Sequence, residues 1–210
     1  MDESPERVVR ANERARAAGF SRSCSAETGR LLRFLASTVR SGTICELGCG
    51  YGAGTSWLHS GLANGVRLLT VDADPAAVAA TRSIFNDCPD VTVLEGDWTE
   101  AARFGPYQLM FVDGGPVTYG SQREVDRDQQ RIFELLLPGG VAIKDDLTPP
   151  NLQSGGRWTP EQVQSDPLRR FWFNHPGAIA TEVVVGPTEA VLLASRDNDT
   201  NKREKDWKRT

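Results

Sequence analysis

The chain has 210 residues, 25% of them charged, and a formal net charge of −4 at pH 7. This length fits one soluble domain with a single core, and the acidic balance argues against nucleic acid as a partner, because phosphates attract a basic surface. No apolar stretch reaches the roughly 20 residues of a membrane span, and the first residues lack the features of a signal peptide, so we expect a cytoplasmic protein without membrane contact.

Two helices are expected at the start of the chain, Pro5–Ala18 and Ala26–Thr38, the second with Ser25 as its cap. Short runs rich in Val, Ile, Leu and Phe then alternate with segments of helical length, which is typical of a parallel sheet with helices between its strands. The expected strands are Thr43–Leu47, Val66–Val71, Val91–Leu94, Gln108–Val112 and Gly140–Lys144. The expected helices between them are Ala53–Leu62, Pro75–Phe85 and Gln122–Leu137.

The last third of the chain departs from this alternation. Thr159 and the proline after it predict the start of a helix that reaches about Phe173, with Gln162 in a capping position. Two apolar runs, Ala178–Val185 and Ala190–Ser195, follow with only a short turn between them and predict an antiparallel hairpin.

Together these elements predict an α/β fold, a doubly wound, seven-stranded, Rossmann-like sheet with a terminal antiparallel hairpin and N-terminal helices. We divide the chain into N-terminal helices over residues 1–41, a core over residues 42–196 and a tail over residues 197–210. The tail is almost entirely polar and is expected to be disordered.

A glycine-rich turn directly after the first strand is the main indication of function. Gly48, Gly50, Gly52 and Gly54 follow the acidic residue Glu46. Closely spaced glycines between a strand and a helix let the backbone bend sharply, and they let a ligand lie against main-chain atoms that a Cβ would shield. The turn therefore predicts a nucleoside-like cofactor.

The cysteines do not point to a metal site. They have no C-x-x-C spacing, and only two histidines, His59 and His175, could join them as zinc ligands. We expect reduced thiols, with Cys45 packed in a strand and Cys49 next to the glycine turn. The four cysteines are Cys24, Cys45, Cys49 and Cys88.

Further motifs follow the other expected strands, and the ordered set carries a family resemblance. Its members are Glu46-Leu-Gly48-Cys-Gly50-Tyr-Gly52, Asp72, Gly96-Asp97-Trp98, Asp113 and Leu137-Pro138-Gly139-Gly140. Together they resemble the class I S-adenosylmethionine-dependent methyltransferases over roughly residues 26 to 195. The pair Asp145-Asp146 and the N-terminal helices look most like the small O-methyltransferases related to the catechol and caffeoyl-coenzyme A enzymes.

The resemblance implies roles for the residues that would bind the cofactor. Gly48, Gly50 and Gly52 would lie under S-adenosylmethionine, and Asp72, at a strand's carboxyl end, is placed to accept hydrogen bonds from both ribose hydroxyls. The alternative role for Asp72 is to cap the next helix, although Asp74 is better placed as that cap.

Three more residues have a cofactor role and a structural alternative. Asp97 could accept from the exocyclic amine of adenine while the backbone N–H of Trp98 faces the ring, or it could cap a short helix over residues 99–103. Glu46 could order the amino group of the cofactor, directly or through water, or hold the turn by accepting backbone N–H bonds. Asp113, after the fourth strand, is expected to contribute to both cofactor binding and catalysis.

The acceptor side of the predicted site is acidic. Asp113, Asp145 and Asp146 follow neighbouring strands and offer three hard oxygen ligands, which suits Mg²⁺ bound to a catechol-like diol. Asp146 stands where the metal-dependent relatives have asparagine, and Pro116 stands where the catechol enzymes have a lysine usually assigned as the base. Asp145 or Asp113 could also serve as a base without metal.

The predicted activity is methyl transfer from S-adenosylmethionine, most simply O-methylation of a small-molecule hydroxyl. Gly48-x-Gly50-x-x-Ala53 also satisfies a relaxed dinucleotide pattern, so an NAD(P)-binding oxidoreductase is one alternative, and a cofactor-binding scaffold without catalysis is another. Glu46 before the glycines and the terminal hairpin favour the methyltransferase. The segment 1–41 would cover the acceptor or form a homodimer contact.

Overall fold

The computed structural model describes residues 4–118, 120–149 and 159–198. The chain forms two compact units, residues 1–115 and residues 116–210. Most of the tail predicted to be disordered, residues 199–210, lies outside the described residues. None of the helices among the described residues is long and apolar enough to cross a membrane.

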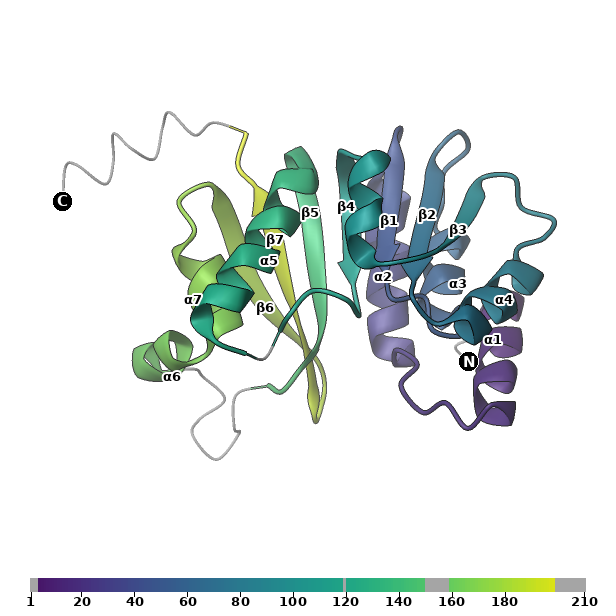
Figure 1. Cartoon of the computed structure of the whole chain (residues 1–210), viewed down its shortest axis with the longest axis horizontal. Helices are drawn as coiled ribbons and strands as arrows, with labels where there is room; N and C mark the ends of the chain where they lie inside the picture. The colour runs from purple at the N-terminus through teal and green to yellow at the C-terminus, as the bar shows by residue number, and fades with distance from the viewer. Residues whose placement is uncertain (1–3, 119, 150–158, 199–210) are drawn as a thin grey trace. The chain divides into compact units, whose positions relative to one another are not determined.

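Four parallel strands form the sheet of the first unit (Figure 1). Their hydrogen-bonded order is β3-β2-β1-β4, so β1 has a neighbour on each side. Residues of β1 and β4 are almost all buried, as expected for strands covered on both faces. The strands are β1 (Thr43–Leu47), β2 (Arg67–Asp72), β3 (Val91–Glu95) and β4 (Tyr107–Val112).

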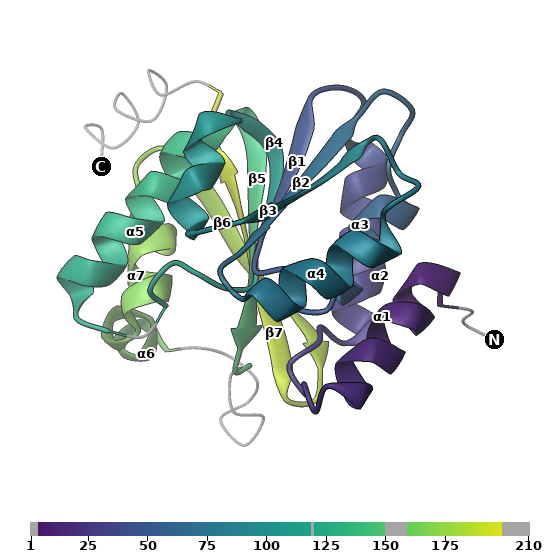
Figure 2. The same ribbon diagram turned by 45° about the vertical axis from the view of Figure 1, so that its right-hand side comes forward.

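Helices cover both faces of this sheet. The short 3-10 helix η1, drawn in teal, lies in front of the strands in Figure 1, and α2, drawn in purple, lies behind them. Helices α1 and α2 pack on α3, and α1 also lies beside α4 (Figure 2). The helices of the first unit are α1 (Glu6–Ala17), α2 (Ala26–Thr38), α3 (Ala53–Ser60), α4 (Pro75–Ile84) and η1 (Trp98–Arg103).

The predicted caps in this unit are confirmed. The side chain of Ser25 accepts a hydrogen bond from the backbone N–H of Thr28 at the start of α2. Asp74 accepts from the N–H of Ala76 at the start of α4, with Pro75 in the first helical position. These caps set where α2 and α4 begin.

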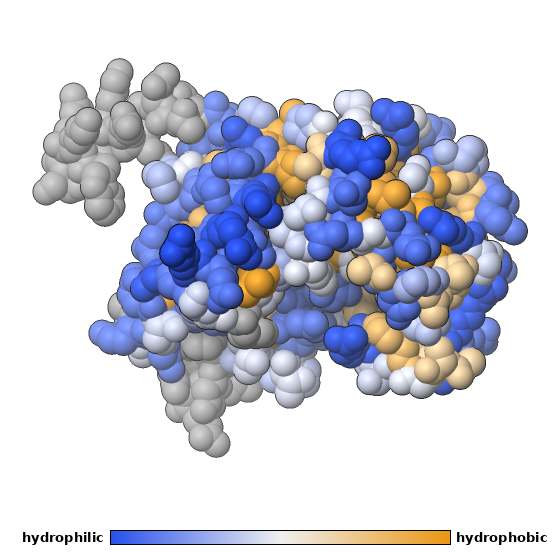
Figure 3. Space-filling view, in the orientation of Figure 1, coloured by the Kyte–Doolittle hydropathy of each residue, from blue (hydrophilic) through white to orange (hydrophobic). Residues whose placement is uncertain are grey.

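The described residues of the second unit form three antiparallel strands and three helices. The strands are hydrogen-bonded in the order β5-β7-β6, which confirms the terminal hairpin. Helix α5 packs on β5 and α7, and its opposite face is strongly hydrophilic (Figure 3). The elements are α5 (Gln122–Leu135), β5 (Leu136–Leu147), α6 (Pro160–Ser165), α7 (Pro167–Asn174), β6 (Ala178–Gly186) and β7 (Glu189–Arg196).

Two expected boundaries in this unit were wrong. The single helix expected from Thr159 to Phe173 is two helices, because Asp166 adopts an extended conformation and caps α7 by accepting from the N–H of Arg169. Proline at position 167 disfavours helical backbone in the residue before it. Likewise α5 ends at Leu135, and β5 begins at Leu136 and runs to Leu147, longer than expected.

Candidate cofactor and acceptor site

The glycine turn after β1 has a backbone that only glycine adopts readily. Gly48, Gly50 and Gly52 have φ angles of 88°, 46° and 90°. An added Cβ at Gly48 would lie 2.8 Å from the backbone nitrogen of Gly114. The carbonyl of Leu47 accepts hydrogen bonds from the N–H groups of Asp113 and Gly114, at 3.0 and 2.9 Å. The turn therefore lies directly against the segment that follows β4.

Asp72, the last residue of β2, borders the glycine turn. Its Oδ2 accepts a hydrogen bond from the N–H of Gly50 at 3.0 Å, and its Oδ1 accepts from the N–H of Asp74 at 2.9 Å. Each carboxylate oxygen has a second lone pair, so the group can accept further bonds from a ligand. Asp74, not Asp72, caps α4. The ribose role of Asp72 stays a prediction.

The end of β3 presents Asp97 and Trp98. Asp97 caps η1 by accepting a hydrogen bond from the N–H of Thr99 at 2.9 Å, which confirms the capping role that the sequence offered as the alternative. Its contact with adenine stays a prediction. Gly115 has a φ of 88°, and an added Cβ there would lie 2.6 Å from the Cβ of Trp98. The segment after β4 is thus enclosed between the glycine turn and Trp98.

Main-chain hydrogen bonds align the carboxyl ends of these strands. The N–H of Gly48 donates to the carbonyl of Val71 at 2.8 Å, and the N–H of Gly96 donates to the carbonyl of Asp72 at 2.9 Å. The residues predicted to bind a cofactor in the first unit are therefore at one edge of the sheet, where parallel α/β folds bind ligands.

Glu46 is completely buried beneath the turn. Its Oε2 accepts hydrogen bonds from the hydroxyls of Thr55 and Thr70, at 2.5 and 2.6 Å, whereas the sequence had suggested backbone N–H donors as the structural alternative. Its Oε1 is buried with no hydrogen-bond partner among the described residues, and it faces Gly54, where an added Cβ would lie 2.3 Å away. Burial raises the pKa of Glu46 to about 7 although both hydroxyls lower it. Its contact with a cofactor stays a prediction.

Two aromatic residues beside the turn were missed by sequence reasoning. The rings of Phe20 and Tyr51 lie with their centroids 5.2 Å apart. Atoms of the Phe20 ring would be 3.2 Å from a Cβ added at Gly50. Tyr51, inside the glycine turn, was a visible signal, but nothing near Phe20 in the sequence marks it as part of a site.

In the second unit, Asp145 and Asp146 lie on a β-bulge. Lys144 pairs with Leu192 and Leu147 with Ala190, so β5 has one more residue than β7 across this stretch. Asp146 has a φ of 60°, which is uncommon for a residue with a side chain. Bulges of this kind redirect side chains and are frequent next to active sites.

Asp145 is a buried carboxyl with an unpaired oxygen. Its exposed fraction is 3%, and Oδ1 has no hydrogen-bond partner among the described residues. The pKa of Asp145 is raised to about 7, chiefly by burial and also by the carboxylates of Asp146 and Glu189, whereas a hydrogen bond with the backbone of Asp146 and the charge of Lys144 act to lower it. Lys144, which directly precedes Asp145, is also buried.

The predicted catalytic and metal-binding residues belong to different units. Asp113 directly follows β4 in the first unit, whereas Asp145 and Asp146 are in β5 of the second. Their joint action at one ion or one substrate stays a prediction.

Residues 45–147 match the family model of a methyltransferase domain. No curated protein is significantly similar to the chain in sequence. Solved structures of similar fold include the O-methyltransferase from Bacillus cereus in complex with SAH, with a TM-score of 0.71 and 21% identity over 94% of this chain and 93% of that one. The O-methyltransferase TomG from Streptomyces achromogenes, involved in tomaymycin synthesis and in complex with SAM, has a TM-score of 0.70 and 21% identity over 93% of this chain and 91% of that one. Cofactor-bound Rv0187 from MTB has a TM-score of 0.73 and 21% identity over 93% of this chain and 92% of that one. These likenesses confirm the predicted Rossmann-like methyltransferase fold.

Proposed function

We propose that the chain transfers the methyl group of S-adenosylmethionine to a hydroxyl of a small molecule, and the match of residues 45–147 to the family model of a methyltransferase domain supports this. The observation that carries this proposal is the bare main-chain turn at Gly48, Gly50 and Gly52, bordered by the carboxylate of Asp72. The solved structures of similar fold that contain SAM or SAH support the choice of cofactor.

In this proposal the cofactor lies along the carboxyl ends of β1 to β4. Gly48, Gly50 and Gly52 leave the main chain open to it, and Asp72 accepts from the ribose hydroxyls. Asp97 and the backbone N–H of Trp98 recognise adenine. Glu46 is buried beneath the turn and links α3 to β2 by accepting hydrogen bonds from the hydroxyls of Thr55 and Thr70.

The site fits a methyl donor better than a nicotinamide dinucleotide. A dinucleotide places its pyrophosphate at the N-terminus of the helix after the turn, which here is the N-terminus of α3. The carboxyl of Glu46 is buried directly before this turn, with one oxygen unpaired, and would repel a pyrophosphate when ionised. S-adenosylmethionine carries no phosphate and has a cationic sulfonium.

Methyl transfer is an in-line displacement, so the protein acts mainly by aligning the two substrates. The acceptor oxygen bonds to the methyl carbon as the carbon–sulfur bond breaks, and the electron pair of that bond remains on sulfur. The hydroxyl proton must pass to a base. We propose Asp145 for this role, with Asp113 as the alternative, because Asp145 Oδ1 is buried without a partner.

We also propose Mg²⁺ as a second cofactor. Asp113, Asp145 and Asp146 provide carboxylate oxygens, the ligands that Mg²⁺ prefers, and the unpaired Oδ1 of Asp145 is an acceptor that a cation would satisfy. When bound, Mg²⁺ would lower the pKa of an acceptor hydroxyl and orient a diol.

Assays of methyl transfer to a panel of catechol-type diols and simple phenols test this function. We expect labelled methyl from S-adenosylmethionine to appear on at least one hydroxyl acceptor. Loss of transfer in EDTA, restored by Mg²⁺, would support the metal, whereas transfer unaffected by EDTA would favour Asp145 as a base without metal. Binding of S-adenosylmethionine without transfer to any acceptor would favour the non-catalytic scaffold.

Helices α1 and α2 have two proposed roles, a cover for the acceptor or a contact between two copies of the chain. Phe34 on α2 is 64% exposed and would be covered by such a contact. Sedimentation velocity would show a dimer if they pair. We keep the cytoplasm as the proposed compartment, with which cysteines that are not joined in disulfides are consistent.

A further inference from the structure

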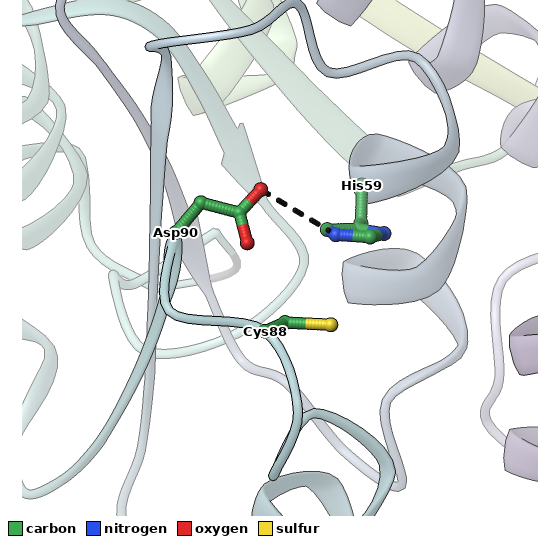
Figure 4. Close-up of side chains that lie close together, drawn as sticks. All are labelled: His59, Cys88 and Asp90. Atoms are coloured by element: carbon green, nitrogen blue, oxygen red, sulfur yellow. Dashed lines mark ion pairs between the residues drawn. The ribbon is translucent and has the colours of Figure 1, made fainter.

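A cluster of possible metal ligands lies at the edge of the first unit opposite the glycine turn. His59 is in the last turn of α3, and Cys88 and Asp90 are in the segment between α4 and β3. Figure 4 shows the imidazole of His59 pointing toward the other two side chains. Asp90 immediately precedes β3, so the cluster is at the amino ends of the strands, away from the proposed methyl-transfer site.

The separations within the cluster approach those of a zinc site. One ligand atom from each residue lies within 4.8 Å of the other two, and His59 Nε2 is 3.5 Å from Asp90 Oδ2. Zinc with bonds of about 2.0–2.3 Å in tetrahedral geometry separates its ligand atoms by about 3.3–3.8 Å. Separations of up to 4.8 Å must therefore shorten by about 1 Å when one ion is bound. The thiol of Cys88, which donates to Asp87 Oδ1 at 3.4 Å, would exchange that weak hydrogen bond for the metal.

The backbone holds these residues in place. The N–H of Cys88 donates to the carbonyl of Phe85, the N–H of Val91 donates to the carbonyl of Cys88, and the N–H of Leu68 donates to the carbonyl of Asp90. The ring of His59 packs edge-on against Phe85 with a centroid separation of 5.4 Å. Little conformational freedom remains to be lost when a metal binds.

The local charges are also compatible with a dication. Arg7, the nearby cation, bonds both oxygens of Asp87 at 2.8 Å, so its charge is already paired. A zinc ion bound by one thiolate and one carboxylate would be electrically neutral. The side chains of His59 and Asp90 are 21% and 40% exposed, which gives an ion access and leaves room for water.

We propose that His59, Cys88 and Asp90 bind one zinc ion, with water as the fourth ligand. The Sγ–zinc bond forms as the thiol of Cys88 releases its proton to solvent. A thiolate with an imidazole selects zinc over Mg²⁺. The bound ion would join the end of α3 to the segment before β3. Sequence spacing pointed away from zinc because these ligands come from different elements.

Titration of the untagged, metal-stripped full chain with Co²⁺ tests the proposal. We expect one cobalt per chain with a thiolate-to-cobalt charge-transfer band, and displacement of that cobalt by zinc. Cobalt on the carboxylates of Asp113, Asp145 and Asp146 would lack this band, so the two sites are distinguished.

Substitutions assign the ligands. Cys88→Ser should abolish the charge-transfer band, and Asp90→Asn should weaken cobalt affinity by more than the roughly 10–100-fold that loss of an outer-shell partner costs. Cys24→Ser is the matched control. Cys24 packs against the apolar cluster to which Cys88 belongs but is not a proposed ligand, so this variant should keep the charge-transfer band.

Circular dichroism establishes whether each variant is folded. If Cys88→Ser does not fold, His59→Gln takes its place in the comparison with the wild-type chain. Absence of the band in the wild-type chain would overturn the proposal. So would an undiminished band in Cys88→Ser or an unchanged cobalt affinity in both Asp90→Asn and His59→Gln.

Discussion

At the scale of single residues, Asp72 is held in position before any ligand arrives. Its two oxygens accept from the N–H groups of Gly50 and Asp74, which fixes the carboxylate at the end of β2. A group fixed in this way loses little freedom on binding, so its hydrogen bonds to a ribose would contribute to affinity almost in full.

Asp72→Asn should weaken binding of S-adenosylmethionine by about 10- to 100-fold, because hydrogen bonds to a charged group contribute roughly 1.5–3 kcal/mol. Titration calorimetry measures this change. Asp74→Asn is the matched control: asparagine also caps helices well, and Asp74 has no proposed ligand contact, so affinity should be unchanged. Equal losses in the two variants would contradict the ribose role.

Glu46 makes stability depend on pH. Its pKa in the folded protein is about 7, above the ordinary value of 4.5, so between these pH values the folded chain binds more protons than the unfolded chain. The stabilising contribution is complete below about pH 4.5 and is lost as the pH rises to about 7, a change of about 3 kcal/mol.

Glu46→Gln removes this titration while it keeps the shape of the side chain. Denaturant unfolding at a series of pH values should show wild-type stability falling relative to Glu46→Gln as the pH rises through this window. Other groups titrate in both proteins and cancel in the difference. Parallel pH curves for the two proteins would show that Glu46 is not held in a proton-binding environment.

Residue roles could be predicted from sequence only where position in an element determines them. Ser25 and Asp74 precede helices and were recognised as caps for that reason. Phe20 was missed because its place beside Gly50 depends on how α1 packs, which no local pattern encodes. The left-handed backbone of Asp146 was missed because a bulge depends on the register with a distant strand.

At the scale of elements, the turn between β1 and α3 depends on Gly48. Gly48→Ala should lower the denaturation midpoint and abolish binding of S-adenosylmethionine, because a Cβ would meet backbone atoms of Gly114. Gly65→Ala is the matched control: Gly65 has a φ of 85°, close to that of Gly48, but no atom within 4 Å of an added Cβ. It should lose only about 1–2 kcal/mol of stability and bind normally. Identical behaviour of the two variants would refute the close approach.

Element boundaries were hardest to predict where proline and capping residues compete with a helical pattern. The pattern from Thr159 to Phe173 is continuous, yet Asp166 and Pro167 end one helix and start the next. The same effect places Leu136 and Leu137, just before Pro138, in a strand and not in α5. Apolar periodicity alone carries no information on such breaks.

At the scale of the whole molecule, the order of elements was predictable because strands and helices alternate and each strand is a short apolar run. The described residues contain the seven strands expected from sequence, parallel in β1 to β4 and antiparallel in β5 to β7. The reaction is harder to predict than the fold, because Asp113, Asp145 and Asp146 do not by themselves identify the acceptor.

Titration calorimetry of the purified chain with S-adenosylmethionine and, separately, with NADH tests the central claim most directly. The account predicts saturable binding of S-adenosylmethionine, one molecule per chain, and no heat of binding with NADH. Binding of NADH by a chain that does not bind S-adenosylmethionine would contradict the account.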